Sequence, residues 1–220
     1  MSANAKILPL AGFALVSAAA WAYLLTAGMT LVMNVMTMPD GTTMAMAVDW
    51  TPAYMVRIFL MWAIMMVAMM LPSAMPVAAQ LGAPPAMLRF AAAYVGAWVL
   101  FAFAATLAQW ALFTQGLLSD GMTVKNGIIA GVLLVAIGLY QFNPRIAQDL
   151  GRCRNGIGYV VSCLRCCAPL MLLFFVVGIM NVAWWIVLAL WVLAEKAVPS
   201  GVWLARASGV ALVIWGIIRL

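Results

Sequence analysis

The sequence predicts an all-α fold: a polytopic transmembrane helical bundle of about six spans, with the N- and C-termini cytoplasmic. Hydrophobic residues make up 68% of the chain and charged residues only 7%, which leaves too little polar surface to cover a water-soluble core. Several apolar runs reach about 20 residues, the length that a helix needs to cross a bilayer. They are apolar on every face, whereas barrel strands alternate, so the spans are predicted to be helices.

The apolar runs predict a single integral membrane domain over residues 1–220. The first run is expected to be an uncleaved signal anchor, because it continues through Leu25 without a polar cleavage site. The predicted spans are, in chain order, 8–28, 54–74, 88–113, 124–142, 167–194 and 198–218.

The distribution of Lys and Arg predicts the orientation of these spans. With the N-terminus inside, seven of the eleven basic residues fall on the cytoplasmic side, as the positive-inside rule requires. The net charge of +6 is therefore explained by membrane topology. No basic stripe is interleaved with exposed aromatic residues, so no nucleic-acid partner is expected.

Methionine is concentrated in one part of the chain. Thirteen of the eighteen methionines lie between residues 29 and 75, and the chain contains no histidine. Thioether sulfur is a soft ligand suited to Cu(I), and imidazole is absent. The predicted outer Met-rich loop, about 29–53, is a candidate site for metal capture; the alternative is an interfacial helix whose methionines enter the lipid. Its candidate ligands are Met36, Met38, Met44 and Met46.

The second predicted span carries another set of methionines. Met61, Met65 and Met69 are four residues apart and share one helix face, so they are candidates for relaying a soft ion. The alternative is that these unbranched side chains only fill the core. Pro72 is expected to end or kink this helix and to free backbone carbonyls.

The cysteines lie in or beside a predicted cytoplasmic Cys/Arg-rich loop, about 143–166. Thiols in that compartment stay reduced, which favours metal binding or redox chemistry over a structural disulfide. Cys163 would share a helix face with Cys166 and Cys167, but these two neighbours are expected to point about 100° apart and not to serve one site together. Cys153 would reach the site by folding back. Cu(I) is the expected ion, zinc on four thiolates is the weaker expectation, and inert cysteines at a helix start are the alternative.

Polar residues inside the last two spans are expected to stabilise the bundle. Asn181 would lie inside the fifth span and hydrogen-bond a neighbouring helix. Glu195 and Lys196 would form an interfacial ion pair at its outer end. Arg206, about two turns into the sixth span, would find its counter-ion in Glu195.

The motifs resemble an uncharacterised bacterial family described as predicted metal-binding integral membrane proteins. The run from Met65 to Pro72 is similar to that family's Met-Met-x-Ala-Met-Met-Leu-Pro signature, and residues 163–167 carry its paired cysteines. Asp149 and Tyr159 stand where the family pattern has a cysteine and a histidine. The resemblance covers roughly residues 55 to 215 and implies a metal-binding protein of the bacterial inner membrane.

Sulfur on both predicted sides of the membrane leads to the main functional expectation. The protein would bind a soft metal, most of all Cu(I), for uptake, relay or delivery, with a copper chaperone or cuproenzyme as its partner. One alternative is a non-catalytic subunit or assembly factor of a larger membrane complex, and another is a membrane thiol oxidoreductase. No nucleotide-binding loop or nucleophile–histidine pair is present, so the expectation leans against an enzyme.

Overall fold

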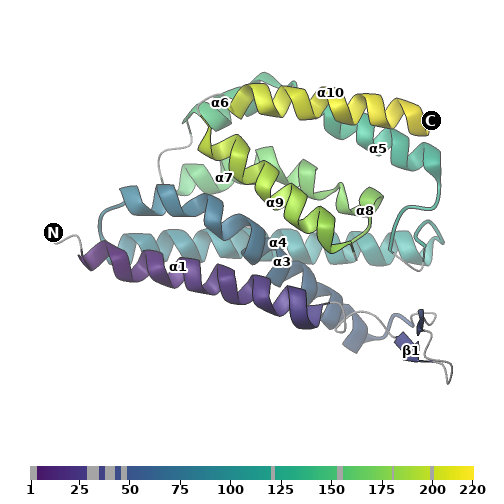
Figure 1. The fold of residues 1–220 in the computed structure, drawn as a ribbon, viewed down its shortest axis with the longest axis horizontal. Helices are drawn as coiled ribbons and strands as arrows, with labels where there is room; N and C mark the ends of the chain where they lie inside the picture. The colour runs from purple at the N-terminus through teal and green to yellow at the C-terminus, as the bar shows by residue number, and fades with distance from the viewer. Residues whose placement is uncertain are drawn as a thin grey trace.

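The helices form three layers, as Figure 1 shows: α1, α3 and α4 on one side, α7 to α9 in the middle, and α5 with α10 on the other. The computed structural model describes residues 4–28, 35–37, 43–45, 49–119, 122–152, 156–179, 181–198 and 201–220. The elements are α1 (Asn4–Tyr23), the π-helical turn η1 (Leu24–Gly28), β1 (Val35–Thr37), β2 (Thr43–Ala45), α3 (Pro52–Gln80), α4 (Pro84–Thr114), α5 (Gly127–Tyr140), α6 (Pro144–Arg152), α7 (Gly156–Met171), α8 (Phe174–Val177), α9 (Val182–Ala197) and α10 (Gly201–Arg219).

The predicted helical membrane fold is confirmed. Within the described residues, five helical stretches are long and apolar enough to cross a membrane, and α5 is a shorter apolar helix. The helices on the outside of the bundle expose large apolar side chains such as Leu8 on α1, Leu100 on α4 and Ile218 on α10. Such surfaces are unfavourable in water and suit contact with lipid.

The prediction of one long span over residues 167–194 is wrong, because the chain reverses within it. Gly178 adopts a φ of 94° after α8, a conformation that glycine takes without a Cβ clash. Asn181 then begins α9 by accepting a hydrogen bond from the Ala183 N–H at 3.2 Å. Asn181 is exposed and caps a helix instead of bonding to a neighbouring helix inside a span.

After this reversal α9 runs back beside α7. The start of α1 and the end of α10 consequently lie at opposite ends of the molecule (Figure 1). The expectation that both termini are cytoplasmic stays a prediction.

Helix α3 lies at the centre of the core and packs against α4, α1 and α9. Pro72 does not end this helix, which runs on to Gln80. Since proline lacks an N–H, the carbonyl of Ala68 loses its intrahelical donor. Ser17 and Trp21 of α1 both donate to that carbonyl, each at 3.0 Å. Two hydrogen bonds between α1 and α3 therefore replace the one that is missing within α3.

Helices α5 and α10 form a close pair through facing glycines. A Cβ on Gly138 would lie 2.7 Å from the Gly209 carbonyl oxygen, and one on Gly131 would lie 2.8 Å from that of Gly216. Small residues at these positions let the two backbones approach each other directly, as is common between transmembrane helices.

Candidate metal centre

The three described cysteines lie in helix α7, inside the bundle. The stretch predicted as a cytoplasmic loop is mostly helical: α6 and α7 occupy it, and residues 158–177 are long and apolar enough to span a membrane. Cys163, Cys166 and Cys167 are at most 2% exposed, and all three are free thiols. Cys153 lies outside the described residues.

Two of the thiols lie against each other. The sulfur atoms of Cys166 and Cys167 lie 3.3 Å apart, and Cys163 lies one helical turn before them in α7. The expectation that Cys166 and Cys167 would point to different places is therefore wrong. Cys166 turns back along the helix and donates to the carbonyl of Cys163 at 3.4 Å, which brings its sulfur over the same patch as that of Cys167.

Cys163 also contacts two side chains from other helices. The hydroxyl of Tyr94 on α4 lies 3.1 Å from its sulfur. Lys196, near the end of α9, donates a hydrogen bond to the same sulfur. A thiol, a phenol and an ammonium group from three helices therefore meet inside the bundle.

These contacts belong to a ring of polar groups that closes through α3. The Tyr94 hydroxyl lies 3.3 Å from Ser73 Oγ and donates to the Met70 carbonyl at 3.1 Å. The Tyr159 hydroxyl donates to the Ser73 carbonyl at 2.8 Å and accepts from Lys196 at 3.3 Å. Such a ring fixes the side chains that surround Cys163, because each polar group inside it has a partner.

Lys196 was not predicted as part of this site. The reversal at Gly178 brings the end of α9 back beside the first half of α7, so Lys196 reaches Cys163 and its ammonium lies 4.9 Å from the centre of the Tyr159 ring. The sequence signal was a lysine at the end of an otherwise apolar helix, which marks a functional candidate in a membrane protein.

The expected ion pairs of Glu195 are not formed. Its carboxylate is buried and accepts a hydrogen bond from Trp191 Nε1 at 2.8 Å. The Arg206 guanidinium lies over the Trp203 ring, 5.4 Å from its centre. Lys196 and Arg206 thus have partners other than the one that the sequence suggested.

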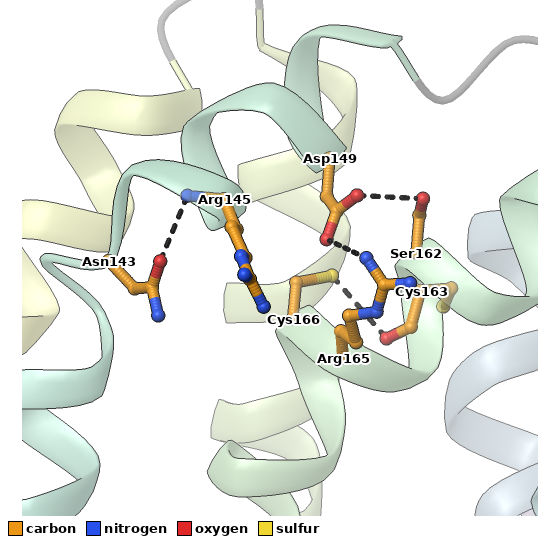
Figure 2. A network of polar contacts seen from close by, with 7 residues as sticks. All are labelled: Asn143, Arg145, Asp149, Ser162, Cys163, Arg165 and Cys166. Atoms are coloured by element: carbon orange, nitrogen blue, oxygen red, sulfur yellow. Dashed lines mark hydrogen bonds and ion pairs between the residues drawn. The ribbon is translucent and has the colours of Figure 1, made fainter.

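A second polar group ties helix α6 to the cysteine helix (Figure 2). Ser162 donates to Asp149 Oδ1 at 2.9 Å, and Arg165 lies 3.8 Å from Asp149 Oδ2. A basic side chain beside a thiol favours the thiolate, and Arg165 is a neighbour of the cysteines in sequence. Arg165 is instead half exposed and paired with Asp149, and Lys196 is the cation that touches Cys163.

The methionines predicted as a relay are all inside the core. Met61, Met65 and Met69 are at most 2% exposed. In the described part of the chain their thioethers make no hydrogen bond, and Met69 lines a largely apolar groove of about 250 Å³ between α1, α3 and α9. Helix α3 runs from the end of the bundle near β1 toward the end that holds α6 (Figure 1), and its Met70 carbonyl accepts a hydrogen bond from Tyr94 of the polar ring.

The outer methionines are only partly described. Met36 on β1 and Met44 on β2 are register partners in a short antiparallel pair of strands, which replaces the loop or interfacial helix expected there. Met38 and Met46 lie outside the described residues.

The arrangement of donors in the described part of the chain suits a soft ion more than a hard one. Two thiols lie with their sulfurs 3.3 Å apart, although among the described residues no group of three or more His, Cys, Asp or Glu side chains is placed to hold a metal ion. Thiolate sulfur favours Cu(I) and zinc over magnesium or calcium. Two or three thiolates without a histidine or carboxylate beside them match the low coordination number of Cu(I).

Comparison with known families decides which class of protein this is. A family model described as PpoB2, copper chaperone, matches residues 59–162 and 154–219. The chain belongs to the PpoB2 copper chaperone family. The match includes every methionine of α3 except Met55 and all of the cysteines, and the outer methionines precede it. No curated protein and no solved structure matches the chain.

Membership of the PpoB2 copper chaperone family supports a copper-related function and a copper-related partner. It agrees with the expectation of a metal-binding membrane family.

Proposed function

We propose that this protein is a membrane-embedded copper chaperone that binds Cu(I) through thiols from the set Cys163, Cys166 and Cys167. The observation that carries the proposal is the burial of these three thiols on successive turns of α7, with the sulfurs of Cys166 and Cys167 3.3 Å apart. Thiolates bind Cu(I) tightly at low coordination number. A site enclosed by protein also keeps the bound ion away from water and oxidants.

The methionines supply the route to this site in the proposal. Met36 and Met44, with their neighbours in the Met-rich segment, capture the ion, and Met61, Met65 and Met69 pass it along α3. Support comes from the direction of α3, whose methionines lead from the β1 end to Met70. The Met70 carbonyl is joined to Cys163 through the single hydroxyl of Tyr94, so the end of the methionine run and the cysteine site are near neighbours.

The basic residues support an orientation for the route. The helix ends on the α6 side of the bundle carry Lys6 of α1, Arg89 of α4, Arg145 and Arg152 of α6, and Arg206 of α10, whereas those on the β1 side carry Arg57 of α3, Lys125 before α5, and Arg219 of α10. By the positive-inside rule the α6 end faces the cytoplasm of a bacterial inner membrane. Copper would then enter from the outer side and be handed over near the α6 end, to a soluble chaperone or a cuproenzyme.

The experiment is anaerobic loading of the detergent-purified protein with Cu(I), followed by desalting and elemental analysis. The wild type is expected to retain about one copper ion per chain, and the variant Cys163→Ser/Cys166→Ser/Cys167→Ser is expected to lose it. A variant with Met61→Leu/Met65→Leu/Met69→Leu is the matched control, because it removes as many sulfurs and should retain the ion. In vesicles this control variant should deliver copper more slowly to an acceptor on the other side.

Folding of each variant is checked by thermal denaturation in detergent. Failure of well-folded wild type to retain copper would contradict the proposal and favour the alternative of a subunit or assembly factor without metal. Equal transfer rates in wild type and in the methionine variant would contradict the relay but leave the cysteine site in place.

A further inference from the structure

The charge of the cysteine site is set by one residue, Lys196. Lys196 is half-buried near the end of α9. It donates to Cys163 Sγ and to the Tyr159 hydroxyl, and it lies over the Tyr159 ring. A cation in such a place needs a compensating partner, because an unpaired charge away from water is strongly destabilising.

No carboxylate supplies that compensation within the described part of the chain. Asp149 is engaged by Ser162 and Arg165 on the far side of α7. Glu195 is next to Lys196 in sequence, but it accepts from Trp191, and no ion pair joins it to Lys196. Of the two groups in contact with Lys196 that can carry a negative charge, the Cys163 thiol ordinarily ionises more readily than the Tyr159 phenol.

A copper ion held by thiolates has a charge that Lys196 matches. Two thiolates that have given up their protons carry two negative charges, and Cu(I) carries one positive charge. The complex therefore keeps one net negative charge, which is costly inside a membrane bundle. An ammonium in hydrogen-bond contact with one of its sulfurs cancels that charge.

We propose that Lys196 is the resident counter-cation of a two-thiolate Cu(I) site that includes Cys163, so that the loaded site is neutral overall. The inference rests on the proposed function. It adds Lys196 as the residue that determines whether the site binds a monovalent or a divalent ion. A monovalent ion on two thiolates fits this site, and a divalent ion on the same two thiolates leaves one positive charge uncompensated. Lys196 acts on the ion through the electric field and the hydrogen bond to Cys163, not as a ligand.

The test compares Cu(I) with Hg(II), because both ions favour linear coordination by two thiolates and differ in charge. Retention of each ion is measured against a competing dithiol for wild type and for Lys196→Met. The variant is expected to lose about 100-fold in Cu(I) affinity, since removing one partner of a buried charge pair leaves the other uncompensated. Its Hg(II) affinity should be maintained or increased.

Two further variants separate charge from structure. Lys196→Arg keeps the cation and should restore Cu(I) affinity to within about 3-fold of wild type, a difference below one kcal/mol. Lys125→Met removes an exposed cation elsewhere and should leave both ions unaffected. If Lys196→Met does not fold, Tyr159→Phe takes its place, because it removes the second anchor of the ammonium; it should weaken Cu(I) several-fold relative to Hg(II).

The outcomes distinguish this inference from the function on which it rests. Wild type that binds no Cu(I) overturns the proposed function. Wild type that binds Cu(I), together with a Lys196→Met protein whose affinities for Cu(I) and Hg(II) are unchanged or fall in parallel, overturns only the role of Lys196. With Tyr159→Phe as the variant, a parallel fall has the same meaning.

Discussion

Helices α3 and α7 both bury sulfur, but they bury it among different neighbours. The methionine thioethers of α3 pack in the apolar core, and the carbonyls of Ala68, Met70 and Ser73 on this helix accept hydrogen bonds from neighbouring helices. The cysteine thiols of α7 meet each other, a phenol and an ammonium. Buried sulfur by itself therefore does not mark a metal site, whereas buried sulfur beside polar and charged groups requires an explanation beyond packing.

The largest expected difference between the two helices is in copper affinity. Cys163→Ser is expected to weaken Cu(I) binding by more than about 100-fold, because a hydroxyl is a poor ligand for a soft ion and because Lys196 loses its partner. Met65→Leu should change the affinity by less than about 3-fold, since leucine fills a similar volume. Titration against a chromogenic Cu(I) chelator measures both. Equal losses in the two variants would mean that the thioethers bind the ion at equilibrium as well.

A smaller effect is expected at the hydroxyl that links the two helices. Tyr94→Phe removes the group that contacts both the Met70 carbonyl and Cys163. We expect about a 10-fold loss of Cu(I) affinity, typical of groups that orient metal ligands, and a free energy of unfolding lower by about 1–2 kcal/mol. Tyr140→Phe is the control, because no hydrogen bond of its hydroxyl is seen in the described structure. Unchanged binding in Tyr94→Phe would show that the methionine helix and the cysteine site are independent.

The smallest effect is expected on the α3 side, far from the cysteines. Ser17→Ala removes one of the two donors to the Ala68 carbonyl that Pro72 leaves open. Stability in detergent should fall by about 1 kcal/mol and copper retention should not change, because Trp21 continues to donate. Trp203→Phe, on an exposed side chain, is the control for detergent effects. A loss of copper in Ser17→Ala would contradict the assignment of this part of α3 to packing.

The sequence was sufficient for the class of fold and for most of the spans, because apolar length follows directly from the bilayer. It failed at residues 167–194, where both sides of the turn are apolar and hydropathy is continuous. The only signals there were Gly178 and Asn181, a left-handed turn residue and a helix cap. The sequence was also sufficient to name the methionines and cysteines that are candidate ligands, and to find the resemblance to a metal-binding membrane family.

The surroundings of the cysteines were beyond the sequence for the same reason. Lys196 is 33 residues from Cys163, and the two meet only because the chain reverses between them. A prediction that lacked this reversal had no residue closer to Lys196 and Arg206 than Glu195, so Glu195 was chosen as their partner. The convergence of Cys166 and Cys167 depended on a side-chain rotation that helical periodicity does not specify.

The most direct test of the account is the X-ray absorption spectrum of the Cu(I)-loaded protein at the copper edge. The account predicts a first shell of sulfur alone, with about two scatterers, which changes in Cys163→Ser and persists in Met65→Leu. A first shell dominated by nitrogen or oxygen, or one that Cys163→Ser leaves unaltered, would contradict the assignment of copper to the cysteines of α7.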